Sequence, residues 1–190
     1  MIDRILRPFS YLFIGHRHKW AVDWIYPFIL TVLVMILLLW MKKYGQVSLY
    51  GDGGLIGRIL GFIQNLPGFF IAALAAIATF NRVDIDKTMP FPAPTLDITV
   101  QGKTVAIELT RRRFLCSMFA FLTAENIILV VFAIFAQSFY LPAKLYFTSS
   151  YHALVSGSFM FIFLFMLSQM MVTTFWGLFY LGDKLHQPDA

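Results

Sequence analysis

One stretch of the chain constrains the fold more than any other. From Ala21 to Met41 there is a single charged residue, Asp23, which lies near the edge. A helix of about 20 residues, rising ~1.5 Å per residue, crosses a hydrocarbon layer of ~30 Å. The stretch therefore predicts a transmembrane helix. Aromatic residues typical of interfacial belts flank it at both ends, namely Trp20, Trp24, Tyr26, Trp40 and Tyr44.

The composition extends this prediction to the whole chain. Of its 190 residues, 59% are hydrophobic and 13% are charged, against about 25% charged in soluble domains. A single globular core could not bury this much apolar surface, so lipid must surround much of it, and helices satisfy their backbone groups in lipid. We predict an all-α membrane protein that forms one membrane domain over residues 1–190, with four transmembrane helices. The predicted spans are residues 20–41, 55–80, 114–140 and 154–181.

The second predicted span is less regular than the others. Leu66–Phe80 alone is too short to cross a bilayer, and extending it back to Leu55 takes in polar residues and a proline. We predict a kinked helix, with a re-entrant or interfacial segment at Leu55–Gln64 as the alternative. Small residues recur every four positions, which predicts close approach of another helix. They are Gly68, Ala72 and Ala76.

Residues 1–19 are predicted to form an interfacial helix followed by a basic segment. Apolar residues recur at helical spacing while Arg4 and Arg7 lie off the stripe, which is typical of a helix in the plane of the membrane interface. Pro8 predicts a break in that helix. An ordinary packed N-terminal segment is the alternative. The apolar stripe consists of Ile2, Ile5, Leu6, Phe9, Leu12 and Phe13.

Residues 81–113 form the main polar segment between the second and third spans. A proline-rich stretch is followed by two β-type runs, Thr95–Val100 and Thr104–Leu109, around Gly102. This pattern predicts a small β-hairpin. Because an isolated hairpin is marginally stable in water, we expect it to pack on another protomer, a soluble partner or the helix ends. Thr110 is a predicted N-cap for the third span.

The distribution of basic residues predicts the orientation. The N-terminal segment, the loop 81–113 and the C-terminal tail hold eleven of the 15 Lys and Arg residues, and the other two loops hold four. The positive-inside rule therefore predicts a multi-pass protein with the hairpin and both termini in the cytoplasm. We interpret the net charge of +5 as this topology signal rather than as affinity for nucleic acid.

A candidate site consists of three polar residues in the predicted third and fourth spans. Glu125 lies about 18 Å along the helix from Arg113, near the bilayer centre, with Asn126 beside it and Gln169 at a similar depth. Ionisable groups at this depth face protein or water rather than lipid. One hypothesis is a proton- or ion-responsive site. The favoured alternative is a protonated Glu125 hydrogen-bonded to Gln169, which would hold helices or subunits together.

Basic residues at the end of the polar segment are candidates for lipid or partner contact. Arg111, Arg112 and Arg113 precede the third span, and Lys103 lies in the predicted turn. Headgroup contact is the expected role, and docking of an acidic partner is the alternative. The sequence contains no phosphate-binding loop, metal-ligand spacing or nucleophile motif. We therefore predict no catalytic residues, no cofactor and no metal, and a protein that is not an enzyme.

The plan of the chain resembles a known family. The basic start, the four spans and the polar segment ending in Leu109-Thr110-Arg111-Arg112-Arg113-Phe114-Leu115-Cys116 resemble small bacterial membrane proteins of anti-phage defence operons, in particular the membrane component of the Kiwa system. The resemblance implies a homo-oligomer in the inner membrane, a tetramer, which senses phage attack. It also implies a soluble, DNA-binding partner on the cytoplasmic face. It supplies no site residues.

Two main functional hypotheses follow. The first is a sensor or scaffold in which the lipid-embedded part detects membrane disturbance while the loop 81–113 and the termini hold a cytosolic effector. The second is an oligomeric ion- or proton-conducting channel with Glu125 in the pore. A membrane enzyme or lipid transporter ranks third, because no paired acid–base or nucleophile set is visible.

Overall fold

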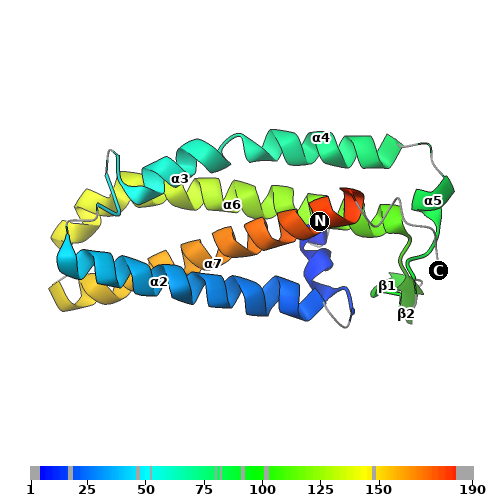
Figure 1. Cartoon of the computed structure of the whole chain (residues 1–190), viewed down its shortest axis with the longest axis horizontal. Helices are drawn as coiled ribbons and strands as arrows, with labels where there is room; N and C mark the ends of the chain where they lie inside the picture. The colour runs from blue at the N-terminus through cyan, green and yellow to red at the C-terminus, as the bar shows by residue number, and fades with distance from the viewer. Residues whose placement is uncertain are drawn as a thin grey trace.

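The computed structural model describes residues 5–16, 19–45, 48–51, 53–79, 81, 83–90, 93–100, 103–146 and 149–182. Part of the predicted interfacial helix, including Ile2 and Arg4, lies outside these residues, as does the C-terminal tail. The side chain of Lys103 also lies outside what the structure describes. The elements that follow are drawn in Figure 1.

The described residues contain four helical segments that are long and apolar enough to cross a membrane, at Ala21–Tyr44, Leu55–Thr79, Arg111–Pro142 and Ala153–Gly182. This confirms the predicted number of candidate spans. The first combines a π-helical turn, η2, with α2, and the second combines α3 with α4. The bounds are η1 Arg7–Phe13, η2 Ala21–Ile25, α2 Tyr26–Tyr44, α3 Leu55–Ile63, α4 Leu66–Thr79, α5 Val83–Asp86, α6 Arg111–Tyr146 and α7 Ser149–Gly182.

The long helices lie in a row (Figure 1). Helices α3 and α4 pack on α6, α6 packs on α7, and α7 packs on α2. At Gly177 the inner two helices approach so closely that a Cβ atom would overlap the side chain of Met118. The core accordingly lies along the inner helices α6 and α7, where Leu122 and Phe163 are fully buried. The outer helices are α2 and α3–α4.

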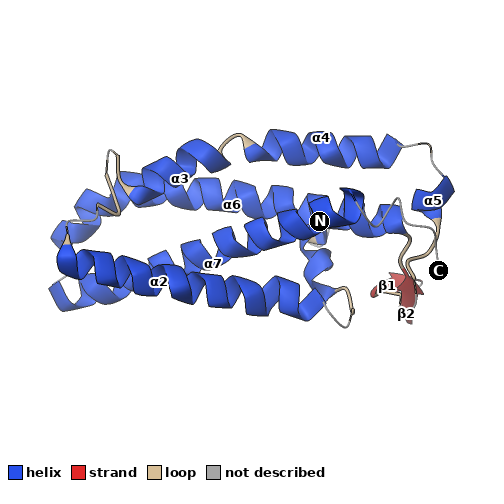
Figure 2. Ribbon diagram, in the orientation of Figure 1, coloured by secondary structure: helices blue, strands red, loops and turns tan. Residues whose placement is uncertain are grey.

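The predicted β-hairpin is present at one end of the row (Figure 2). Strand β1, Thr95–Val100, pairs antiparallel with β2, Lys103–Glu108, so β2 begins one residue earlier than expected. Its base is attached to the rest of the chain. Gly15 and Thr95 exchange two backbone hydrogen bonds of 2.9 and 3.1 Å, and Arg111 N donates to Lys87 O at 3.1 Å. The hairpin is therefore fastened at its base to the loop after η1, and the segments that flank it are bonded to each other at the start of α6.

The second candidate span is interrupted where the sequence predicts a kink. Gln64 and Asn65 form a turn between α3 and α4. The small-residue stripe, however, does not pack within the chain. Gly68, Ala72 and Ala76 are all exposed, and a Cβ atom at Gly68 would meet nothing within 4 Å. The residues that α4 buries are instead Phe70 and Ile77, because large side chains rather than small ones fill the space against α6.

The N-terminal segment differs from the predicted interfacial α-helix. It is a 3₁₀ helix, η1, with Pro8 in its first turn, and it packs on α6. Its buried residue is Tyr11, which is 0% exposed and lies off the predicted apolar stripe. On the face that carries Tyr11, the N-terminal residues thus match the alternative prediction of an ordinary packed segment. Ile5, Leu6 and Phe13 of the stripe point outward and are exposed.

Candidate functional site: a polar cluster inside the helix row

The site begins with the backbone carbonyl of Asp23, which accepts a hydrogen bond from another helix. In a regular α-helix the N–H of residue 27 would bond to the carbonyl of Asp23, but Pro27 has no N–H. The backbone here is a π-helical turn, in which Tyr26 N–H bonds to Ala21 O, five residues earlier. Gln169 of α7 donates its Nε2 to the Asp23 carbonyl oxygen at 2.8 Å. The fourth span thus supplies a donor to a carbonyl to which Pro27 cannot donate.

The Asp23 side chain is the centre of a buried ion pair. Its carboxylate is paired with the Lys19 ammonium, and it accepts a hydrogen bond of 3.3 Å from the Tyr11 hydroxyl. Lys19 and Asp23 are 2% and 1% exposed. Burial lowers the pKa of Lys19, and Asp23 partly opposes that shift. Removing one partner of such a buried ion pair strongly destabilises the protein, because the remaining buried charge then has no counter-charge.

Tyr11 joins η1 to this pair and to α6. Its ring stacks on Phe121 of α6 with 5.2 Å between ring centres, and Lys19 Nζ lies 4.1 Å from the centre of the Tyr11 ring. Burial raises the pKa of Tyr11 well above its usual value, and the nearby Asp23 carboxylate adds to that shift. The phenol is therefore a neutral hydrogen-bond donor throughout the physiological pH range.

Glu125 and Asn126 of α6 border the same cluster. Glu125 is 2% exposed and lies close enough to Asp23 and Tyr11 to interact with both electrostatically. Asn126 donates its Nδ2 to Met170 Sδ of α7 at 3.0 Å. Three side-chain oxygen atoms make no hydrogen bond within the described part of the chain. They are Glu125 Oε2, Asn126 Oδ1 and Thr173 Oγ1.

The predicted polar trio is thus assembled differently from the expected arrangement. The side chains of Glu125, Asn126 and Gln169 are all buried. Within the described residues, however, no hydrogen bond joins Glu125 to Gln169, because the Gln169 amide is bonded to Asp23. Sequence reasoning missed Lys19, Asp23 and Tyr11 as members. Two signals point to them, the i, i+4 spacing of Lys19 and Asp23 and the proline four residues after Asp23.

The three consecutive arginines have different environments within the chain, and their contact with headgroups or a partner stays a prediction. Arg112 forms a two-point ion pair with Asp86, at 2.6 and 2.9 Å, and donates Nη1 to the carbonyls of Ile77 and Ala78 at 2.8 and 3.0 Å. It therefore caps the end of α4. Arg111 is only 4% exposed. Arg113 remains exposed, because the first turn of α6 presents these residues to three different sides.

Other predictions concern the start of α6 and metal binding. Thr110 is the N-cap predicted for this helix, since its Oγ1 accepts a hydrogen bond of 3.3 Å from Arg113 N.

Within the part of the chain that the structure describes, no group of three or more His, Cys, Asp and Glu residues could hold a metal ion.

Comparisons with protein-family models, with curated proteins and with solved structures find no match to this chain.

Proposed function

We propose that this protein is a non-enzymatic, oligomeric sensor or scaffold of the bacterial inner membrane that anchors a cytosolic effector. In this proposal both termini and the hairpin face the cytoplasm, as the distribution of basic residues predicts. The resemblance to the Kiwa membrane component makes anti-phage defence the proposed context and a tetramer the proposed assembly. In that context the effector would contact nucleic acid and this chain would not.

The observation that carries the proposal is a chain of contacts from the polar cluster to the hairpin. At one end Tyr11 bonds to Asp23, which Gln169 holds against α7. Four residues after Tyr11, Gly15 pairs with Thr95 at the start of β1. The 3₁₀ helix η1 is therefore fastened both to the centre of the helix row and to the hairpin. A rearrangement of the long helices that moves Tyr11 would also move the base of the hairpin.

The hairpin is a suitable surface for a soluble partner. A two-stranded sheet has outer edges whose backbone groups can pair with an extended segment of another protein. Val105 of β2 is 47% exposed, and Asp97 of β1 is also exposed. An exposed β-branched residue next to such an edge is a typical anchor for strand addition.

Amide hydrogen exchange in lipid nanodiscs tests the coupling. Tyr11→Phe keeps the ring stack on Phe121 and removes the hydrogen bond to Asp23. We expect the amides of Gly15 and Thr95 to exchange about fivefold faster, as the loss of one hydrogen bond of ~1 kcal/mol would produce. Tyr140→Phe, at the other end of α6, is the matched control. Equal exchange in wild type and Tyr11→Phe would show that η1 does not couple the two regions.

Co-purification of soluble proteins with the full chain from its native cells tests the partner role. Val105→Asp should reduce the recovery of a specifically bound soluble protein, and Tyr146→Asp should leave that recovery unchanged. Tyr146 is 92% exposed and lies at the far end of α6. A further variant replaces both strands of the hairpin, including Val105. It retains Leu109, because this residue is 0% exposed and belongs to the core. Full recovery after that replacement would exclude the hairpin as the docking surface.

A proton-conducting function is the second candidate, and one observation favours it. Glu125 is a buried ionisable group whose Oε2 makes no hydrogen bond in the described residues, and ionisable groups inside membrane spans often mark proton relays. Glu125 is enclosed within the protomer, however, so a path would have to run through the protomer rather than between copies. Proton flux into liposomes should then fall in Glu125→Gln. Unchanged flux would leave Glu125 with a structural role.

A further inference from the structure

A pocket of about 570 Å³ lies at the end of the helix row opposite the hairpin. It is bounded by the end of α2, the loop at residues 48–50, the end of α6 and the start of α7. Its deeper wall is apolar and includes Met35, Leu38 and Met160. Its polar groups are Lys42, Ser48, Tyr50, Tyr140 and Ser156. None of the described residues that line it is acidic.

The polar rim of this pocket is held in place by packing. Tyr50 stacks on Tyr140 with 4.7 Å between ring centres, and its hydroxyl lies 2.9 Å from Ser156 Oγ. Burial raises the pKa of Tyr50, so its phenol is a neutral donor. The loop that carries Tyr50 turns back tightly, since a Cβ atom at Gly54 would lie 2.8 Å from the Tyr50 carbonyl oxygen. The two hydroxyls are therefore held together as a hydrogen-bonded pair at one point of the rim.

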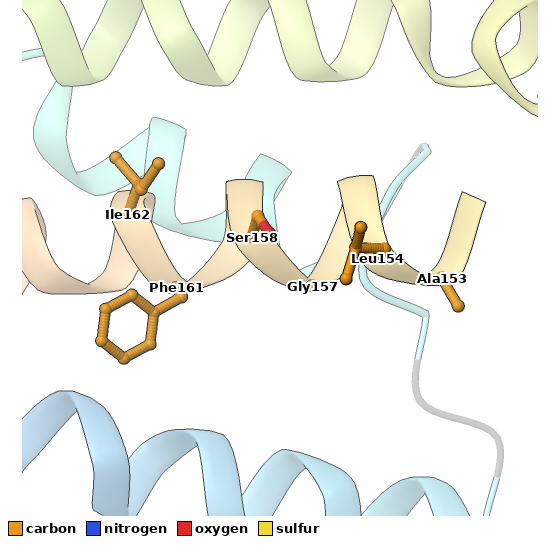
Figure 3. A pocket seen from close by; sticks show the side chains of 6 residues that line it. All are labelled: Ala153, Leu154, Gly157, Ser158, Phe161 and Ile162. Carbon is orange, nitrogen blue, oxygen red and sulfur yellow. The ribbon is translucent and has the colours of Figure 1, made fainter. Parts of the chain in front are cut away.

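An apolar trough continues from this pocket along α7. Ala153 and Gly157 also line a second pocket of about 530 Å³, shown in Figure 3, in which Phe161 points toward α2. Phe161 in turn lines a third pocket of about 400 Å³ between α2 and α7, together with Trp24 and Phe165. From Ala153 to Phe165 the trough spans about 18 Å of helix. That length slightly exceeds one leaflet of the hydrocarbon core, ~15 Å.

We propose that the pocket and trough together bind one anionic phospholipid from the surrounding bilayer. The phosphate would lie at Lys42, and the hydrogen-bonded pair of Tyr50 and Ser156 would donate its remaining hydroxyl proton to it. One acyl chain would follow α7 past Gly157 as far as Phe161. A cation and neutral hydroxyls without an acid complement a phosphate, and an apolar wall of leaflet length complements an acyl chain. A helix from a second copy would fill the trough but would leave this polar rim without a counterpart.

Native mass spectrometry of the detergent-purified protein tests the proposal. Phosphatidylglycerol and phosphatidylcholine are added in separate titrations. Lys42→Gln should weaken phosphatidylglycerol binding about fivefold, equivalent to ~1 kcal/mol for one basic residue at an anionic headgroup. Lys43→Gln is the matched control, because Lys43 Nζ lies over the Tyr44 ring instead, at 5.6 Å from its centre. Equal weakening by both variants, or no weakening by Lys42→Gln, would overturn the proposal.

A second variant tests the trough independently of charge. A Cβ atom at Gly157 would meet nothing within 4 Å, so Gly157→Leu fits sterically and places a side chain where the acyl chain would lie. We expect reduced binding of phosphatidylglycerol with an unchanged unfolding temperature in detergent. If Gly157→Leu instead leaves lipid binding intact and alters the number of copies in the assembly, the trough is a contact between protomers and the lipid proposal is wrong.

Discussion

The inner and outer helices of the row differ in how much of their surface the chain itself covers. In the most apolar window of each candidate span, 44% of α6 and 33% of α7 is buried, against 11% in the spans formed by α2 and by α3–α4. All four segments are similarly apolar, so hydrophobicity does not separate them. The inner helices are distinguished by polar contacts and close packing, because the buried polar cluster and the close approach at Gly177 both involve them.

This difference shows where the specificity of the fold lies. Lipid solvates apolar side chains as well as protein does, so burying a leucine between helices gains little by itself. Hydrogen bonds, an ion pair and tight packing are then what hold one helix beside another. The first span is joined to the inner helices by polar contacts in its N-terminal half, where Asp23 of η2 contacts Lys19, Tyr11 and Gln169 and Thr31 Oγ1 of α2 donates to Ser168 Oγ at 3.4 Å.

The largest effect is expected where α2 joins the inner helices. Asp23→Leu would leave the buried Lys19 without its partner and should destabilise the protein by about 3–5 kcal/mol. The double variant Lys19→Met with Asp23→Leu removes both charges and should recover most of that loss. Both are measured by SDS-induced unfolding in mixed micelles. A double variant as unstable as the single one would show that the pair does not act as an electrostatic unit.

A smaller but clear difference in the cost of a leucine-to-alanine substitution is expected between an inner and an outer helix. Leu122 of α6 is 0% exposed, and Leu37 of α2 is 50% exposed. Leu122→Ala should cost about 2–4 kcal/mol through lost packing, whereas Leu37→Ala should change stability by no more than ~0.5 kcal/mol. The same unfolding measurement compares them. Similar costs at the two positions would mean that another protomer covers α2 as fully as the chain covers α6.

The bond between Gln169 and the Asp23 carbonyl should contribute about 0.6 kcal/mol, the average for interhelical hydrogen bonds in membranes, and no more than ~1.7 kcal/mol, their maximum. Gln169→Leu tests it directly. In a Pro27→Ala background residue 27 regains an N–H for the Asp23 carbonyl, so Gln169→Leu should then cost less. A double-mutant cycle isolates this coupling. Additive effects of the two substitutions would indicate that Pro27 is not the reason for the interhelical bond.

The smallest effect is expected at the water-facing end of α6. Hydrogen bonds from Arg112 lower the pKa of Asp86 below its usual value. The contribution of this carboxylate is therefore present above pH ~3.9, the value for an unfolded aspartate, and is lost as the pH falls through the lowered folded pKa. Asp86→Asn should lower the unfolding temperature slightly at pH 7 and not at the acid end. Asp97→Asn, on an exposed carboxyl of β1, should show no comparable difference.

Particular residues show how far the sequence predicts the site. Glu125 and Gln169 are recognisable because polar groups are conspicuous in apolar spans. Asp23 is equally polar, but its position near the end of a span resembles that of an ordinary interfacial residue. Its burial depends on η1, whose Tyr11 covers it. The arginines illustrate the same limit, since Arg111, Arg112 and Arg113 are equivalent in sequence and differ only because neighbouring elements cover them unequally.

By itself the sequence determined the four apolar helices, the break near Gln64 and the hairpin, because hydropathy, backbone hydrogen bonding and turn residues are local properties. Which helices are inner and which polar groups meet follows from the packing alone. The Asp23 carbonyl, to which Pro27 cannot donate, receives a hydrogen bond from Gln169, 146 positions away. No local pattern encodes such a contact. It depends on which helices pack together, and apolar helices in lipid can pack in several arrangements.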